Sequence, residues 1–174
     1  MRYADIHKMN ISDGPGIGVS LYVQGCALHC PGCFNEGTWD FDGGKEYTND
    51  TMGTILDLLK PEWMTRLSIL GGEPLCPANY KELIKLTYLA HEENKDKPDF
   101  KVWMWTGRTY ENLMAEINSE SDRKHPHPLE LVLKGVDYLV DGPFIQDKKD
   151  LTLKWRGSSN QRIIALNGNE EIGQ

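Results

Sequence analysis

A chain of 174 residues is long enough for one domain with a sizeable core and short for two. Its 19 lysines and arginines against 26 aspartates and glutamates give a formal net charge of −7, which argues against a nucleic-acid or anionic-membrane partner. No stretch approaches the ~18 consecutive apolar residues of a membrane span, and MRYADIHKMN lacks the apolar run of a secretory signal. We therefore expect a single domain, 1–174, in the cytoplasm, where thiols stay reduced.

The predicted elements alternate between strands and helices. In chain order we expect a strand at 19–25, a helix at 51–60, a strand at 66–70, a helix at 78–95, a strand at 100–105, helices at 109–120 and 129–135, and a strand at 136–142. Loops are expected at 11–18, 41–50 and 121–128. The apolar spacing of the helix at 78–95 places Tyr80, Leu83, Ile84, Leu86 and Tyr88 on one face.

Alternating strands and helices predict an α/β fold with parallel strands. A complete eight-stranded barrel needs ~250 residues, so we expect a partial, open βα barrel or an open α/β sheet. In both, ligands bind at the C-terminal ends of the strands. The segments 26–33, 71–74 and 106–108 each follow a predicted strand. We therefore expect these loops to meet at one edge of the sheet.

The sequence CALHCPGC holds Cys26, Cys30 and Cys33 in the spacing C-x3-C-x2-C. Three thiolates are one short of the four that usually hold a 4Fe-4S cluster, which would leave one iron open to an exogenous group. The alternative is a structural zinc with His29 or Cys76 as the fourth ligand. The cysteines alone leave both possibilities open.

The cysteine spacing followed by Phe34 resembles the radical S-adenosylmethionine (SAM) superfamily. The resemblance implies that the three cysteines bind three irons of a 4Fe-4S cluster and that SAM chelates the fourth. The segment GGEP resembles the motif of that family that receives the methionine amino group, and Glu73 can accept a hydrogen bond from an ammonium. The residues thus expected to bind SAM are Gly32, Cys33, Phe34, Gly71, Gly72, Glu73, Pro74 and Thr106. For the segment 106–108, a strand end followed by a helix cap at Thr109 is the plain alternative.

Further motifs resemble a narrower group, the glycyl-radical-enzyme activating proteins. The match is most specific to the activating proteins of anaerobic ribonucleoside-triphosphate reductase, through DGPG (13–16), CPGCFN (30–35), TWD (38–40), VWMWTG (102–107), YLVDGPF (138–144) and WRGSSNQRII (155–164). It implies a radical SAM type of partial barrel that reductively cleaves SAM to a 5′-deoxyadenosyl radical. That radical would generate a glycyl radical on the large subunit of the reductase. The implied partners are this subunit and a low-potential electron donor such as a flavodoxin, and no acid–base residue is required.

Several residues keep plainer interpretations. Cys76 is expected to be a free thiol, His125 and His127 loop histidines, and Asp141 a salt-bridge or turn residue. Trp155, Arg156 and Asn160 are expected to cover the active site or contact the reductase. Gly18 departs from the basic residue that relatives often carry, and 121–135 is longer than the family segment. Other functions remain open: a radical SAM enzyme for another glycyl-radical enzyme or a small molecule, a cluster-bearing electron carrier, or a zinc-stabilised binding module.

Overall fold

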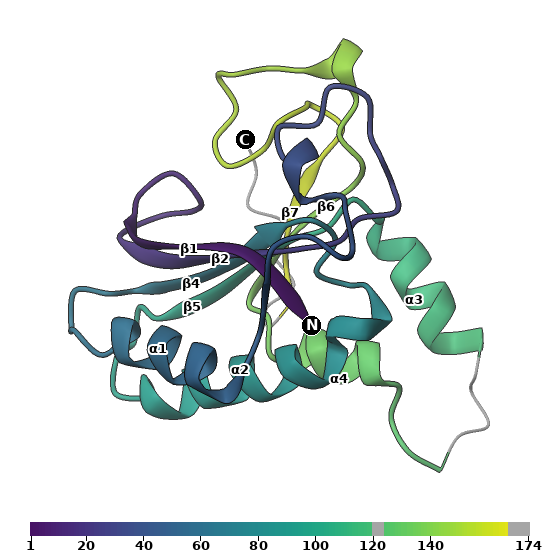
Figure 1. The fold of residues 1–174 in the computed structure, drawn as a ribbon. Helices are drawn as coiled ribbons and strands as arrows, with labels where there is room; N and C mark the ends of the chain where they lie inside the picture. Colours follow the sequence, from purple (N-terminus) through teal and green to yellow (C-terminus); the bar gives the residue numbers. More distant parts are fainter. Residues whose placement is uncertain (120–123, 167–174) are drawn as a thin grey trace.

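The computed structural model describes residues 1–119 and 124–166, in which helices cover one face of a seven-stranded sheet (Figure 1). The strand order is β3-β1-β2-β4-β5-β6-β7. The strands are β1 (Arg2–Asn10), β2 (Gly18–Val23), β3 (Lys45–Glu46), β4 (Arg66–Gly71), β5 (Lys101–Trp105), β6 (Tyr138–Asp141) and β7 (Arg162–Ala165). The α-helices are α1 (Asn49–Leu59), α2 (Tyr80–Glu93), α3 (Tyr110–Ser119) and α4 (Pro128–Lys134). Three short 3₁₀ helices are η1 (Glu36–Thr38), η2 (Pro77–Asn79) and η3 (Gln146–Lys148).

The α/β class is confirmed, and the strands are parallel only in the centre of the sheet. β2, β4, β5 and β6 pair in parallel, whereas the flanking strands β1, β3 and β7 pair antiparallel. The parallel pairing expected of the four predicted strands is confirmed, but the sheet as a whole is not parallel, because the unpredicted β1, β3 and β7 are antiparallel. Seven residues separate β1 from β2, too few for the crossover that a parallel pair needs.

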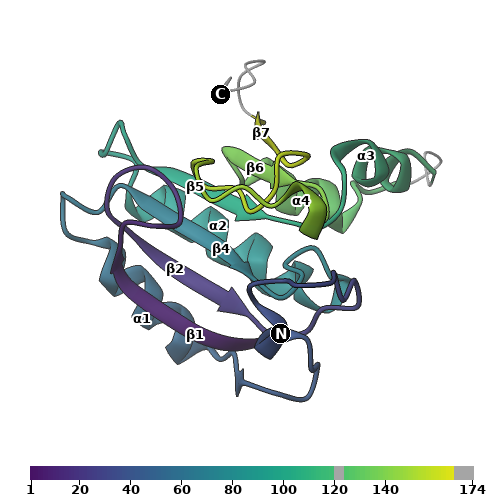
Figure 2. The same ribbon diagram turned by 90° about the horizontal axis from the view of Figure 1, so that it is seen from above.

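Alternation along the strands gives the sheet one apolar face beneath which α1, α2 and α4 lie (Figure 2). Val19, Leu21 and Val23 of β2 are fully buried in this core with the apolar faces of the helices. On α2 the buried residues are Tyr80, Leu83, Leu86, Thr87 and Ala90. Tyr88 is 62% exposed, so its expected place on this face is wrong. Its helical angle falls outside the stripe that the i, i+3 and i+7 positions define.

The opposite face of the sheet carries polar and aromatic side chains. Ser68 of β4 lies beside Ser20 of β2 on one side and Trp103 of β5 on the other. Trp103 is buried against Val140 and Ile163, with Trp105 packed on the same cluster. Both tryptophans therefore face away from the helices.

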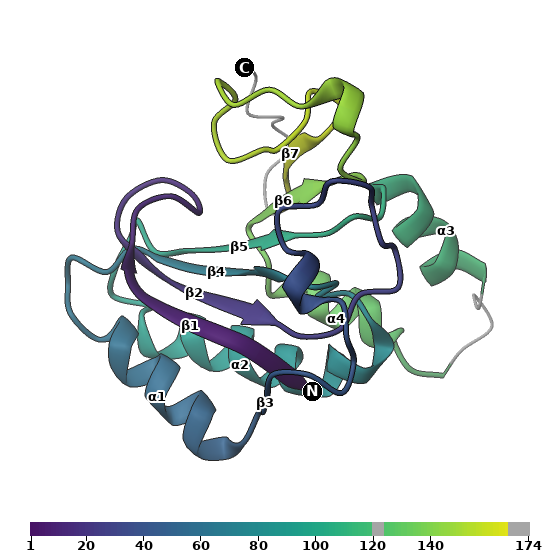
Figure 3. The same cartoon turned by 45° about the horizontal axis from the view of Figure 1, so that its top comes forward.

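β2, β4 and β5 run in the same direction, so the segments that follow them leave the sheet at the same edge (Figure 3). The loop that carries the cysteines follows β2, the segment 71–74 ends β4, and the segment 106–108 follows β5. The expected meeting of these three loops is confirmed.

The histidines expected in the loop 121–128 lie near the start of α4. His125 is exposed, and the buried His127 caps the helix, its Nδ1 accepting a hydrogen bond from the Leu129 N–H at 3.1 Å. The first part of the expected loop, 120–123, lies outside the described residues. None of the helices within 1–119 and 124–166 has both the length and the apolar character needed to cross a membrane.

Candidate functional site

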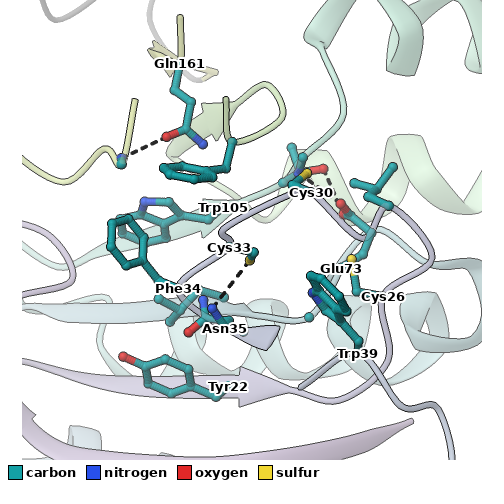
Figure 4. Close-up of a pocket in the computed structure, with 18 of the residues that line it drawn as sticks. Tyr22, Cys26, Cys30, Cys33, Phe34, Asn35, Trp39, Glu73, Trp105 and Gln161 are labelled. Atoms are coloured by element: carbon teal, nitrogen blue, oxygen red, sulfur yellow. Dashed lines mark hydrogen bonds between the residues drawn. The ribbon is translucent and has the colours of Figure 1, made fainter. Parts of the chain in front are cut away.

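A cavity of about 330 Å³ lies at the edge where the three loops meet (Figure 4). Its lining comes from the cysteine loop, from the segments that follow β4 and β5, and from 142–161. This volume falls at the lower end of the range for small-molecule and cofactor pockets. The loops that the sequence singled out therefore enclose one ligand-sized space.

Cys26, Cys30 and Cys33 all line this cavity, and none forms a disulfide. Backbone hydrogen bonds shape the loop that carries them: the Cys26 N–H donates to the Trp39 carbonyl at 3.0 Å, and the Cys33 N–H donates to the Cys30 carbonyl at 3.1 Å. Burial raises the pKa of the Cys26 thiol, while the backbone N–H groups of Leu28 and His29 oppose this rise. Coordination to iron would deprotonate such a thiol.

The two residues considered as a fourth zinc ligand lie elsewhere. The ring of His29 stacks on the indole of Trp39, with 4.6 Å between centroids, and Cys76 lies outside the cavity lining as the N-cap of η2. Among the described residues, no group of three or more His, Cys, Asp or Glu side chains is arranged to hold a single metal ion.

The segment 71–74 lies backbone against backbone on the start of the cysteine loop. The Gly72 N–H donates to the Val23 carbonyl at 2.9 Å, and the Glu73 N–H donates to the Gly25 carbonyl at 2.8 Å. A Cβ atom on Gly72 would lie 2.4 Å from the Gly25 carbonyl oxygen, closer than two such atoms can approach. Gly71 has a φ of +102°, which side chains rarely permit. Glycine is therefore required at both positions.

Glu73 joins the loops that follow β4 and β5. Its Oε1 accepts hydrogen bonds from the Leu75 N–H at 2.9 Å and the Thr106 hydroxyl at 2.8 Å, and its Oε2 accepts one from the Gly107 N–H at 2.9 Å. Burial raises the pKa of this carboxyl, and these hydrogen bonds oppose the rise.

The residues expected to bind SAM divide into two groups. Those that line the cavity are Cys33, Phe34, Gly71, Gly72, Glu73 and Thr106. Gly32 and Pro74 are outside the lining. Gly32 packs so closely on Gln146 that a Cβ atom would lie 2.2 Å from its Oε1, and the Pro74 carbonyl accepts a hydrogen bond from Asn79 at 3.3 Å.

The residues 143–161, which we call the strap, lie against the cysteine loop. Phe144 contacts the ring of Phe34 at 5.2 Å between centroids, and the ammonium of Lys149 lies 4.9 Å from the Phe34 ring centre. Gly157 and Gln161 of the strap line the cavity. The Gln161 Oε1 accepts the Gly157 N–H at 2.8 Å, which closes this turn of the strap.

The three strap residues singled out from the sequence have structural contacts outside the cavity lining. Trp155 packs on Trp103, Arg156 donates to the Gln161 carbonyl, and Asn160 donates to the Pro143 carbonyl. Asp141 forms the expected salt bridge, with Arg162 at 2.5 Å.

Several residues that line the cavity were not predicted from the sequence as site residues. Tyr22, Asn35, Trp39, Trp105, Phe144 and Gln161 line the cavity with Asp13, which accepts the Tyr22 hydroxyl at 2.8 Å. Burial and this hydrogen bond raise the pKa of Tyr22. The alternation of side chains along β2 could have placed Tyr22 on the open face of the sheet, where it lies beside Leu70. No motif near Gln161 indicates that its side chain lines the cavity.

Comparison with known proteins gives matches over nearly the whole chain. Residues 12–164 match the protein family described as a 4Fe-4S single cluster domain. The anaerobic ribonucleoside-triphosphate reductase-activating protein of Vibrio cholerae is 36% identical over 165 residues, which cover 94% of this chain and 97% of the relative. The proteins of the same name from Escherichia coli K12 and Enterobacteria phage T4 are 35% and 33% identical, over 95% and 94% of this chain and 99% and 93% of their own lengths.

Proposed function

Because this chain belongs to the family of anaerobic ribonucleoside-triphosphate reductase-activating proteins, we propose that it cleaves SAM at a cluster held by Cys26, Cys30 and Cys33 to place a glycyl radical on the reductase. The family match identifies an iron–sulfur activating enzyme with a 4Fe-4S domain. That identification sets aside the zinc-stabilised binding module. The cysteine ligands, the SAM chemistry and the partners are our proposals.

The donor set of the cavity suits the cluster. Three free thiols line one space, and thiolates are the ligands that iron–sulfur clusters use. Three protein ligands leave one iron free for a group from outside the chain. Cys26, Cys30 and Cys33 would hold the cluster, and the reduced cluster would supply the one electron needed to break the S–C5′ bond of SAM into methionine and a 5′-deoxyadenosyl radical.

The protein residues bind and orient SAM. Gly71 and Gly72 let the end of β4 pack directly on the backbone of Tyr22–Gly25, and both line the cavity that would hold SAM. From the same segment, Glu73 presents a carboxylate to the ammonium of SAM. Thr106 lines the cavity from the loop that follows β5. Phe34, beside the last cysteine, adds an apolar wall. We propose that Gly32 and Pro74, which lie outside the cavity lining, stabilise the conformation of the loops that carry the lining residues.

The fold leaves room for a protein substrate. We propose that the four parallel strands form a partial, open βα barrel of the radical SAM type. Residues 1–174 would form its single domain. The cavity lies at the open edge, where a glycine-bearing loop of the reductase large subunit would enter. A low-potential electron donor such as a flavodoxin would reduce the cluster.

One observation carries this proposal: the three cysteines and the Gly71–Glu73 segment line the same cavity. The test begins with anaerobic reconstitution with iron and sulfide, reduction with dithionite, addition of SAM and measurement of 5′-deoxyadenosine. The Cys26/Cys30/Cys33→Ala variant is compared with Cys76→Ala, which removes a thiol outside the cavity. We expect product from the wild type and Cys76→Ala and none from the triple variant.

Addition of the reductase then tests the substrate. Electron paramagnetic resonance is expected to show a glycyl radical only when reductase, SAM and cluster-loaded protein are all present. A cluster that leaves SAM intact would indicate an electron carrier and contradict the proposal. SAM cleavage without a glycyl radical on the reductase would indicate another glycyl-radical enzyme or a small molecule as the substrate.

A further inference from the structure

The hydroxyl of Thr106 forms its hydrogen bonds within the protein. Thr106 is 3% exposed, and its hydroxyl donates to the Glu73 Oε1 at 2.8 Å while accepting the Arg108 N–H at 3.1 Å. A hydroxyl has a single proton to donate. In this arrangement its proton is used by Glu73, and Thr106 has no side-chain donor left for a ligand.

The carboxylate of Glu73 retains one acceptor position on one oxygen. Each carboxylate oxygen can accept about two hydrogen bonds. Oε1 has two donors, from Leu75 and Thr106, whereas Oε2 has one, from Gly107. Because Glu73 lines the cavity, the remaining acceptor position of Oε2 is available to a bound donor.

In the described residues no cation donates a hydrogen bond to the buried Glu73 carboxylate; Arg108 acts on it only through its charge and is itself paired with Glu116 at 2.5 Å. Glu73 is 6% exposed, and its three hydrogen-bond donors in the described part of the chain are uncharged. A buried carboxylate is stabilised by a nearby positive charge. An ammonium group bound in the cavity would add a positive charge in direct contact with the carboxylate.

We propose that Thr106 is a positioning residue, whose hydroxyl holds the Glu73 carboxylate so that Oε2 faces the ammonium of SAM. This inference rests on the proposed function, because that function supplies the ligand. Without the hydroxyl, the carboxylate keeps only the backbone donors of Leu75 and Gly107, and its orientation toward the cavity is less firmly fixed. Loss of the hydroxyl should therefore weaken SAM binding and leave the later electron transfer unchanged.

Thr106→Val tests the inference, because it removes the hydroxyl and keeps the shape of the side chain. In the reconstituted enzyme we expect the KM for SAM in 5′-deoxyadenosine formation to rise about tenfold, the order expected for a lost hydrogen bond to a charged group. We expect kcat and iron content to remain close to the wild-type values. The SAM concentration that changes the electron paramagnetic resonance spectrum of the reduced cluster should rise in parallel.

Two variants separate positioning from general damage. Thr106→Ser restores the hydroxyl and is expected to recover most of the SAM affinity. Thr87→Val is the matched control, because Thr87 is 1% exposed and its hydroxyl donates to the Leu83 carbonyl at 2.9 Å, away from the cavity. It is expected to leave the KM for SAM unchanged.

The possible outcomes are distinct. An unchanged KM in Thr106→Val would overturn the inference while leaving the proposed function intact, and so would an equal rise in Thr87→Val. A rise in Thr106→Ser as large as that in Thr106→Val would also overturn it, since the hydroxyl would then not be the group that matters. Failure of the cluster-loaded wild type to cleave SAM would instead overturn the proposed function.

Discussion

The indole N–H of Trp105 donates a hydrogen bond to the backbone carbonyl of Trp155, 2.8 Å away. This bond joins β5 to the strap, and the ring of Trp155 also packs on Trp103 at 5.3 Å between centroids. Trp155 has a φ of +58°, a left-handed conformation that costs free energy in a bulky residue. The contacts with β5 offset that cost and hold the strap beside the cysteine loop.

Trp105→Phe should therefore loosen the strap. The substitution keeps an aromatic ring but removes the donor, and we expect the free energy of unfolding to fall by about 1 kcal/mol. Trypsin should cleave after Lys149 and Lys154 faster than in the wild type. Trp63→Phe, at a side chain that is 49% exposed, is the control for loss of an indole. Equal cleavage rates in the two variants would argue against a role for the hydrogen bond.

The guanidinium of Arg66 holds the turn that precedes β2. Arg66 is 1% exposed. Its Nη1 donates to the Pro15 carbonyl at 2.7 Å, its Nη2 to the Asn10 carbonyl at 2.8 Å and its Nε to the Ser68 hydroxyl at 2.7 Å. Burial lowers the pKa of this guanidinium, and Asp13 opposes the shift. One buried side chain thus satisfies several acceptors of the segment that carries the DGPG motif.

Arg66→Met should be among the most damaging substitutions outside the cavity. It leaves these carbonyls without their donor, and we expect a loss of roughly 2–4 kcal/mol in the free energy of unfolding, measured with urea. Arg2→Met is the comparison, because Arg2 also donates to backbone carbonyls, those of Gly43 and Gly44, at a more exposed site. Its expected loss is about 1 kcal/mol. Equal losses in the two variants would show that the burial of Arg66 does not increase its contribution to the free energy of unfolding.

The sequence predicts the centre of the sheet better than its edges. β2 and β4 are mostly buried and carry apolar residues at the positions that face the helices, and helices of regular apolar spacing follow them. β1 is mostly exposed or half-buried and carries charged and polar residues, so neither alternation nor hydrophobicity marks it as a strand. Its pairing with β2 depends on the hairpin geometry, and that of β7 with β6 on a contact between distant parts of the chain.

The site shows the same division. The cysteines and Gly71–Glu73 occur in short motifs whose spacing is visible in the sequence. Gln161 and Phe144 reach the cavity only because β7 returns antiparallel beside β6 and brings the strap over the cysteine loop. Thr106 was expected to bind SAM, and its contact with Glu73 depends on the parallel register of β4 and β5.

A salt bridge between Glu111 of α3 and Arg162 of β7 should contribute to stability in a pH-dependent way. Both oxygens of Glu111 accept from Arg162 at 2.8 Å, and this lowers the Glu111 pKa from 4.5 to about 2. A lowered folded-state pKa means that the stabilisation is fully present above about pH 4.5 and is lost as the pH falls toward 2.

Glu111→Gln is therefore expected to be less stable than the wild type at pH 7, and the difference should shrink between pH 4.5 and pH 2. Urea unfolding across this range measures it. High salt should also reduce the difference at pH 7, because Glu111 is exposed and its charge is screened. A difference that stays constant down to pH 2 would exclude the ionised carboxylate as its source.

Two glycines give opposite expectations for the same substitution. At Gly72 an added Cβ would meet the Gly25 carbonyl oxygen at 2.4 Å, and both partners are backbone, so the two loops must separate. We expect Gly72→Ala to lower the free energy of unfolding by about 1–3 kcal/mol. Because Gly25 directly precedes Cys26, this separation should also reduce the iron bound after reconstitution.

At Gly53, within α1, an added Cβ meets no heavy atom within 4 Å. Gly53→Ala should stabilise the protein by about 0.5–1 kcal/mol, because alanine loses less conformational freedom in a helix. Thermal unfolding and iron content of the two variants, measured side by side, check both expectations. A Gly72→Ala protein as stable and as rich in iron as Gly53→Ala would show that the loops after β2 and β4 tolerate separation, and the close backbone contact would then not be what shapes the site.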